Sequence, residues 1–167
     1  MSYVQDQGNK IGNFVPRLNG NGQKVYRCIA GEQTSAKVLC QMAWSASGPI
    51  VEPFFATAGN KPCFPLEDCA SGDVVDCVVA GYIPAVQGGS SGKNTTACST
   101  YTKGSVIIVN ATGWLIDYAA TWTEAYNSLS TAAAITNAAL GITLSSGPTA
   151  TINLFMVEKP FIVCCNT

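Results

Sequence analysis

The most constraining feature of the sequence is an alternation of apolar and polar residues in the segment 137–159. The alternation stands on both sides of a cluster of turn formers at 145–148, which reads Ser-Ser-Gly-Pro. A period of two is typical of a strand with one buried face, and turn formers between two such runs indicate a tight turn. The segment therefore predicts a β-hairpin. The side chains expected to face the core are Ile142, Leu144, Ile152 and Leu154.

Further strand-like runs lie upstream, and Gly or Pro punctuates most of them. The expected strands lie within 24–31, 36–44, 47–57, 73–86 and 103–120, the last divided by a turn at 110–113. The prolines in 47–57 suit an edge or a bend. The segments 61–72 and 87–97 are rich in turn-forming residues and are expected to be loops. Many short strands with this punctuation predict an all-β domain, either a sandwich or a barrel.

One segment departs from the strand pattern. Thr121 is followed three residues later by Glu124, which is the spacing of a helix capping box. Apolar residues then recur at helical spacing, which predicts one short helix over 122–130. The alternative is a Thr/Ser/Ala-rich excursion from a sheet.

At the other end of the chain, residues 1–22 are rich in Gly, Asn and Gln and predict an extended arm, followed by a single β-rich domain over 23–167.

The composition of the chain limits the classes of function that we expect. Charged residues make up 11% of the chain and the net charge is -1, against about 25% charged residues in ordinary soluble domains. So little like-charge repulsion favours a protein that works inside an assembly. The absence of a basic excess argues against nucleic acid as a partner. No apolar run is long enough for a membrane helix, and the first residues lack a secretion signal, so we expect synthesis in the cytoplasm and no membrane partner.

The eight cysteines have no zinc-site spacing. The sequence contains no Cys-x-x-Cys pair and no histidine, so we expect no metal. In a chain made in the cytoplasm the cysteines are expected to be reduced, and several of them to be small buried hydrophobes.

Known catalytic patterns are incomplete. The segment 88–94 resembles a phosphate loop, but it lacks the first glycine and the hydroxyl residue after Lys93, so no nucleotide cofactor is expected. Without histidine the common nucleophilic triads are excluded. The clustered acids at 67–76 read as solvated charges rather than as a catalytic pair. The sequence therefore predicts a protein that is not an enzyme.

Aromatic residues at four-residue spacing allow two interpretations. Trp114, Tyr118 and Trp122 either pack in the core and at a subunit interface or form a platform on which sugars stack. In the N-terminal arm, Phe14, Val15 and Leu18 are the apolar points that a partner could order. These six residues are the candidate interface residues.

The order of strands and turns over 70–157 resembles the cement or head-decoration proteins of tailed bacteriophages. The matching positions are Gly72, Asp73, Val75, Gly81, Gly104, Val106, Ile108, Ala111-Thr112-Gly113, Leu140-Gly141, Leu144, Gly147, Ile152 and Leu154. The resemblance implies attachment to the outside of an icosahedral head, usually as trimers and sometimes as dimers, with the major capsid protein as partner. It implies a protein of the virion surface, made in the host cytoplasm. The alternative function is a carbohydrate-binding or adhesin-like sandwich.

Overall fold

The computed structural model describes residues 17–53, 61–87, 100–109, 115–117, 138–148 and 151–162. Within these ranges the chain is all-β, as the sequence predicts, and contains no helix. The strands are β1 (Arg17–Leu18), β2 (Lys24–Ala30), β3 (Cys40–Ser45), β4 (Gly48–Pro53), β5 (Lys61–Pro65), β6 (Val74–Gln87), β7 (Thr100–Tyr101), β8 (Val106–Val109), β9 (Leu115–Asp117), β10 (Ala138–Thr143), β11 (Gly147–Pro148) and β12 (Thr151–Ile162). The expected helix at 122–130 lies outside the described residues, as do residues 1–16 of the expected arm.

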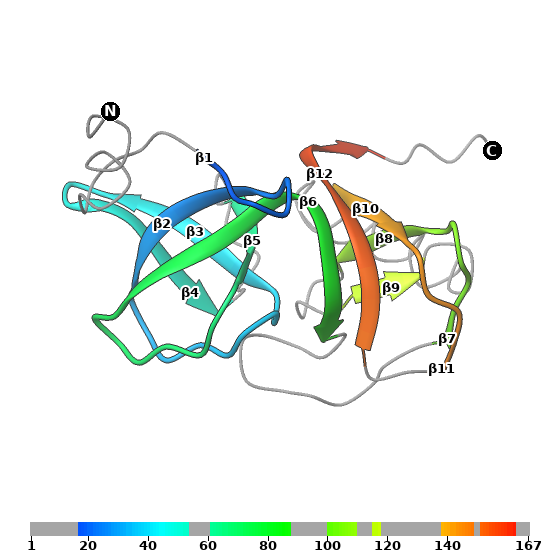
Figure 1. Cartoon of the computed structure of the whole chain (residues 1–167), viewed down its shortest axis with the longest axis horizontal. Helices are drawn as coiled ribbons and strands as arrows, with labels where there is room; N and C mark the ends of the chain where they lie inside the picture. The colour runs from blue at the N-terminus through cyan, green and yellow to red at the C-terminus, as the bar shows by residue number, and fades with distance from the viewer. Residues whose placement is uncertain are drawn as a thin grey trace, which may run out of the picture.

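Five strands form a closed barrel (Figure 1, left). Their order is β2-β4-β3-β5-β6, and pairing of β6 with β2 closes the ring. The pairing of β2 with β4 is parallel and covers two residue pairs, Ile29 with Ile50 and Ala30 with Val51. Pro49 and Pro53 flank those two pairs, so their missing N–H groups do not interrupt the hydrogen bonding to β2.

A second sheet continues from the same strand β6 in the order β6-β12-β10-β8-β9 (Figure 1, right). The first half of β6 pairs with β2, and its second half, from Gly81 onward, pairs with β12. Gly81 has a φ of 106°, and a Cβ atom there would lie 3.1 Å from the Cα of Gln23. A glycine at this position therefore lets one strand serve both the barrel and the second sheet. Strands β7 and β11 pair separately.

Two cores correspond to the two parts. The barrel interior is rich in sulfur and comprises Cys28, Ala30, Cys40, Met42, Val51, Cys63, Cys69, Val75, Cys77 and Val79. The other core combines side chains from the barrel wall, such as Phe64 and Val78, with the inner face of the second sheet, which includes Ile152 and Leu154. Cys77 and Val78 are neighbours in β6 and enter different cores, because successive strand residues point to opposite faces.

The predicted hairpin is present, with two corrections. Strands β10 and β12 pair antiparallel, and Ile152 and Leu154 are buried as predicted. The connection is not a tight turn, because its Gly147–Pro148 segment forms β11 and pairs with β7. Ile142 and Leu144 were expected in the core but are 39% and 42% exposed.

A β-bulge explains the exposure of these two side chains. In the pairing with β8, Ala139 is opposite Ile108 and Gly141 is opposite Ile107. Strand β10 therefore has one extra residue, Leu140, with no partner in β8. An extra residue reverses the alternation of every residue after it. Leu140 is therefore buried, and the residues at 142 and 144 turn outward.

The segment 61–72 was expected to be a loop, and this prediction is wrong for its first five residues. Lys61–Pro65 forms β5, between β3 and β6. Pro62 and Pro65 look like strand breakers in the sequence. They are compatible with β5 because Pro62 stands near its start and Pro65 is its last residue, where missing donors cost least.

In the described part of the chain, no helix is long and apolar enough to span a membrane.

Candidate interaction surface

An exposed row of apolar side chains crosses the outer face of the second sheet. Phe155 of β12 lies opposite Tyr82 of β6 on one side and opposite Ile142 of β10 on the other. Their exposed fractions are 49%, 43% and 39%, respectively. Leu144 extends the row, since its N–H donates to the carbonyl oxygen of Asn153 at 2.8 Å. We call Tyr82, Ile142, Leu144 and Phe155 the apolar stripe.

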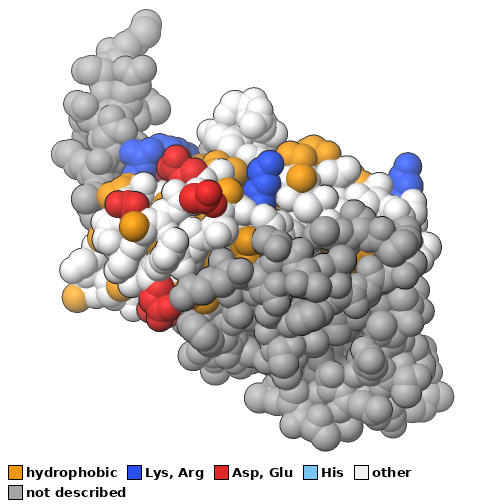
Figure 2. Space-filling model, turned by 90° about the horizontal axis from the view of Figure 1, so that it is seen from below, with side chains coloured by type: hydrophobic (Ala, Val, Ile, Leu, Met, Phe, Trp, Pro, Cys, Tyr) orange, Lys and Arg blue, Asp and Glu red, His pale blue; other side chains and the backbone are white. Residues whose placement is uncertain are grey.

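The stripe stands on an uncharged part of the molecule. No Asp, Glu, Lys or Arg occurs in the segments 81–87, 138–148 or 151–157, which form most of this sheet. On the face shown in Figure 2, the acidic side chains gather on the left, over the barrel half. Protein interfaces are depleted in charge at their centres and enriched in aromatic residues. The segments 81–87, 138–148 and 151–157 have this composition, so covering them would desolvate no charged side chain of their own.

A second bulge positions one end of the stripe. Between Ile152 and Leu154 the register with β6 shifts, so that β6 has an extra residue near Pro84 and Ala85. Ala85 has a φ of 54°, which is unusual for a residue other than glycine. The side-chain oxygen of Asn153 accepts a hydrogen bond from the Ala85 N–H at 3.1 Å. This bond stabilises the bulge that follows Tyr82 and Ile83 in β6.

The backbone of Asn153 is also fixed, by a hydrogen bond to the connection that follows β10. Its N–H donates to the Ser145 hydroxyl at 2.8 Å, which ties β12 to the connection that follows β10. The sequence pattern places Asn153 and Thr151 on the outer face, and both residues do face outward. However, Asn153 is half-buried and its side chain has a structural partner, so it is not a simple solvent-facing position.

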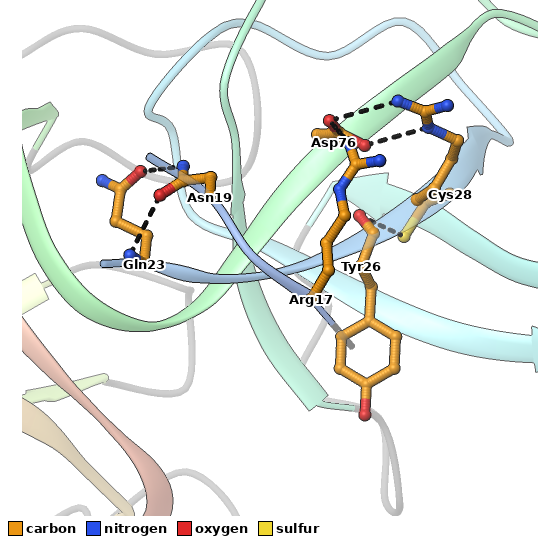
Figure 3. Close-up of polar contacts among 7 residues, drawn as sticks. Arg17, Asn19, Gln23, Tyr26, Cys28 and Asp76 are labelled. Carbon is orange, nitrogen blue, oxygen red and sulfur yellow. Dashed lines mark hydrogen bonds and ion pairs between the residues drawn. The ribbon is translucent and has the colours of Figure 1, made fainter. Parts of the chain in front are cut away.

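The junction with the barrel holds the backbone of Tyr82. The Gln23 side chain donates from Nε2 to the Tyr82 carbonyl oxygen at 2.6 Å. Gln23 is in turn fixed by Asn19, which donates from Nδ2 to Gln23 Oε1 at 2.7 Å and accepts from the Gln23 N–H at 3.0 Å (Figure 3). Lys24 forms an ion pair with Glu158 of β12, which is a second link between barrel and sheet.

Strand β1 is attached to the barrel by an ion-pair cluster. Asp76 of β6 pairs with Arg17 of β1, and its Oδ1 accepts a hydrogen bond from Arg27 Nε at 3.1 Å (Figure 3). Arg27 lies directly opposite Asp76 in the β2–β6 pairing. Leu18, the next residue in β1, is 74% exposed. It is the one predicted interface residue that the structure describes, and it presents an apolar side chain to solvent at the edge of the barrel.

The other five predicted interface residues lie outside the described residues: Phe14, Val15, Trp114, Tyr118 and Trp122. The segment 88–94, with its resemblance to a phosphate loop, also lies outside them. Sequence reasoning missed the stripe residues Tyr82 and Phe155. Phe155 could have been found, because it occupies an outward position of the same alternation that places Leu154 in the core.

Three of the four clustered acids have separate structural partners. Asp68 accepts a hydrogen bond from the Ala36 N–H at 2.7 Å, and Asp73 accepts one from the Ala70 N–H at 2.8 Å. Asp76 belongs to the ion-pair cluster above. Among the described residues, no group of three or more Cys, Asp or Glu side chains is arranged to hold a metal ion.

No family model matches the chain, and no curated protein matches it. Among solved structures, the chain is similar to the N base of the head fiber protein gp8.5 of bacteriophage phi29. The identity is 11%, the match covers 82% of this chain and 96% of that one, and the TM-score is 0.48.

Proposed function

We propose that this protein is a structural cement or decoration protein, which binds the outer surface of a bacteriophage head and stabilises contacts between major capsid subunits. The observation that carries the proposal is the apolar stripe on sheet segments that contain no charged residue. The resemblance of segment 70–157 to head-decoration proteins also supports it, and that segment contributes all four stripe residues. In this proposal the protein is made in the host cytoplasm, is not an enzyme and needs no cofactor.

The stripe faces the major capsid protein. Fully burying a Phe, Ile or Leu side chain favours association by about 1.5–3 kcal/mol relative to leaving it exposed. Because the stripe residues are already about half buried, docking gains roughly 1 kcal/mol for each of them. A trimer, which the resemblance favours over a dimer, presents three such faces to the shell, and multivalency then makes attachment stable.

The proposal is tested with heads that lack this protein and with purified variants. Mass spectrometry of purified virions should find the chain at high copy number. Phe155→Ser should lower binding to the heads at least tenfold, while its melting temperature stays within a few degrees of the wild type. Val74→Ser is the matched control, because Val74 is 41% exposed on the barrel half of the same strand β6. This control should bind normally.

Two results would contradict the proposal: a chain found only in lysate, or equal binding by Phe155→Ser and wild type. Sedimentation of both variants separates a second possibility. If Phe155→Ser dissociates the free oligomer, the stripe joins copies of this chain rather than chain and shell. The alternative carbohydrate-binding function depends on Trp114, Tyr118 and Trp122, and a glycan array tests it directly.

A further inference from the structure

One layer of the barrel interior is built largely from cysteine. Strands β2, β3, β5 and β6 each contribute one thiol, and Cys69 adds a fifth after β5. The five are Cys28, Cys40, Cys63, Cys69 and Cys77, and all of them are free and buried.

The sulfur atoms contact one another and nearby polar groups. The Cys28 thiol donates to the Met42 sulfur at 3.6 Å, and the Cys69 sulfur lies 2.8 Å from the Thr34 hydroxyl. Hydrogen bonds with the thiols of Cys28 and Cys63, followed by burial, raise the pKa of Cys77 well above its ordinary value. Burial is the main cause that raises the pKa of Cys40, followed by the charges of Cys63 and Cys69.

The strand register shows which of these cysteines lie close enough together to form a disulfide. Cys40 of β3 lies directly opposite Cys63 of β5. Directly opposite residues of antiparallel strands have Cα atoms about 4.5–5.5 Å apart, which is within the roughly 4.4–6.8 Å that a disulfide spans. Both side chains point into the barrel. This pair can therefore be bridged without moving either strand.

The contacts of Cys77 do not have this geometry. Cys77 is opposite Tyr26 in β2 and opposite Pro65 in β5. Its thiol neighbours Cys28 and Cys63 are each two residues further along those strands, and such diagonal positions are about 7–8 Å apart. At that separation a disulfide requires backbone movement.

We infer that Cys40 and Cys63 form a latent disulfide site, which a small-molecule disulfide such as oxidised glutathione closes when the barrel opens. The Cys40 thiolate attacks one glutathione sulfur and expels a glutathione thiolate. The Cys63 thiolate then attacks the Cys40 sulfur, forms the Cys40–Cys63 bond and expels the second glutathione. Two cysteine thiols are oxidised, one glutathione disulfide is reduced to two thiols, and the two protons pass to the released glutathione.

The site is latent because the closed barrel protects it. The attacking species in thiol–disulfide exchange is the thiolate, and a buried thiol with a raised pKa is unreactive. Exchange therefore proceeds through transient opening of the barrel. Once formed, the disulfide closes a loop that contains all of β4, and it links two strands of the closed ring. Such a link restricts the unfolded chain and raises the unfolding temperature by about 5–10 °C.

The experiment uses the full chain, incubated with excess oxidised glutathione at a temperature just below the melting transition. Free thiols are then alkylated, and the protein is digested without reduction. Mass spectrometry should find the Cys40–Cys63 pair as the main cross-link among the five barrel cysteines, together with a higher melting temperature. At low temperature the same treatment should leave the five barrel cysteines alkylatable only after denaturation.

Variants make the assignment specific. Cys28→Ser should still form the cross-link, whereas Cys63→Ser should not. The mapping on wild type does not depend on either variant folding. A main product with Cys77 joined to Cys28 or Cys63, or glutathione adducts on Cys40 and Cys63 without a cross-link between them, would overturn the inference.

Discussion

Gly141 lies so close to Phe155 that a Cβ atom on Gly141 would be 2.0 Å from the carbonyl oxygen of Phe155. The same atom would be 2.8 Å from the carbonyl carbon of Phe155 and 2.9 Å from the Cα of Met156. These are backbone atoms in the paired strand β12, so they cannot rotate away as a side chain could. The close approach of β10 and β12, which places Ile142 beside Phe155 in the stripe, therefore requires a glycine at position 141.

Gly141→Ala should separate β10 from β12 and lower the free energy of unfolding by more than about 2 kcal/mol, the range of severe steric changes in a core. Thermal denaturation followed by circular dichroism measures the loss. Gly20→Ala is the control, because a Cβ at Gly20 would have nothing within 4 Å. The close approach would be disproved if both variants melted at the same temperature.

Two isoleucines in neighbouring strands should respond differently to truncation. Ile152 is 1% exposed and belongs to the core, so Ile152→Ala should cost about 2–5 kcal/mol of stability. Ile142 is exposed in the stripe, so Ile142→Ala should cost less than about 1 kcal/mol and weaken binding to phage heads instead. Denaturant titration and a head-binding assay measure the two effects. A large stability loss in Ile142→Ala would show that the stripe belongs to the core.

The contrast between these isoleucines also shows how far the sequence can be interpreted. Alternation predicts that strands exist and, for β12, which residues are buried, because each pleated strand has one inner face. It fails for β10 because the bulge at Leu140 depends on how β10 meets β8, and one chain segment alone does not encode that pairing. The short strand β5 was missed for a similar reason, since its prolines are acceptable only at its particular positions in the sheet.

The candidate surface was less predictable than the fold. Tyr82 and Ile142 become neighbours of Phe155 only through the order in which β6, β12 and β10 pair. Strand β6 is far from β10 and β12 in the sequence, so local patterns carry no information about its contact with them. The pairing of β10 with β12 was predicted, but the outward direction of Ile142 depends on the bulge at Leu140. The low charge of the chain predicts a protein that associates with others, which stays a prediction, and the stripe lies in the segments that contain no charged residue.

Asn153 should stabilise the bulge at Ala85 through its side-chain oxygen. Asn153→Ala removes the acceptor of the Ala85 N–H and should cost about 1–2 kcal/mol, the usual consequence of leaving such a donor without its partner. Asn153→Asp keeps an acceptor oxygen at the same place and should retain most of this stability. Hydrogen exchange at the Ala85 amide should be faster in Asn153→Ala only. Equal exchange in all three proteins would exclude this role for Asn153.

The buried thiols should make the protein sensitive to alkaline pH. The pKa values of Cys40 and Cys77 are raised in the folded state above their ordinary value of 9.0. The stability that these groups contribute is fully present below about pH 9 and is lost as the pH rises further, because the unfolded chain then releases protons that the folded chain retains. Each thiol contributes a slope of up to about 1.4 kcal/mol per pH unit. Burial lowers the pKa of Lys61 from 10.5, which gives one opposing contribution, since stability from this group rises with pH.

Cys77→Val tests the origin of this slope, because valine is apolar, only slightly larger than cysteine, and does not titrate. Between pH 8 and pH 10.5, the melting temperature of the wild type should fall more steeply than that of Cys77→Val. Val79→Ala, another change in the barrel core, should lower the melting temperature at every pH and keep the wild-type slope. If wild type and Cys77→Val lose stability in parallel as the pH rises, the buried thiol of Cys77 does not control the alkaline limit of this fold.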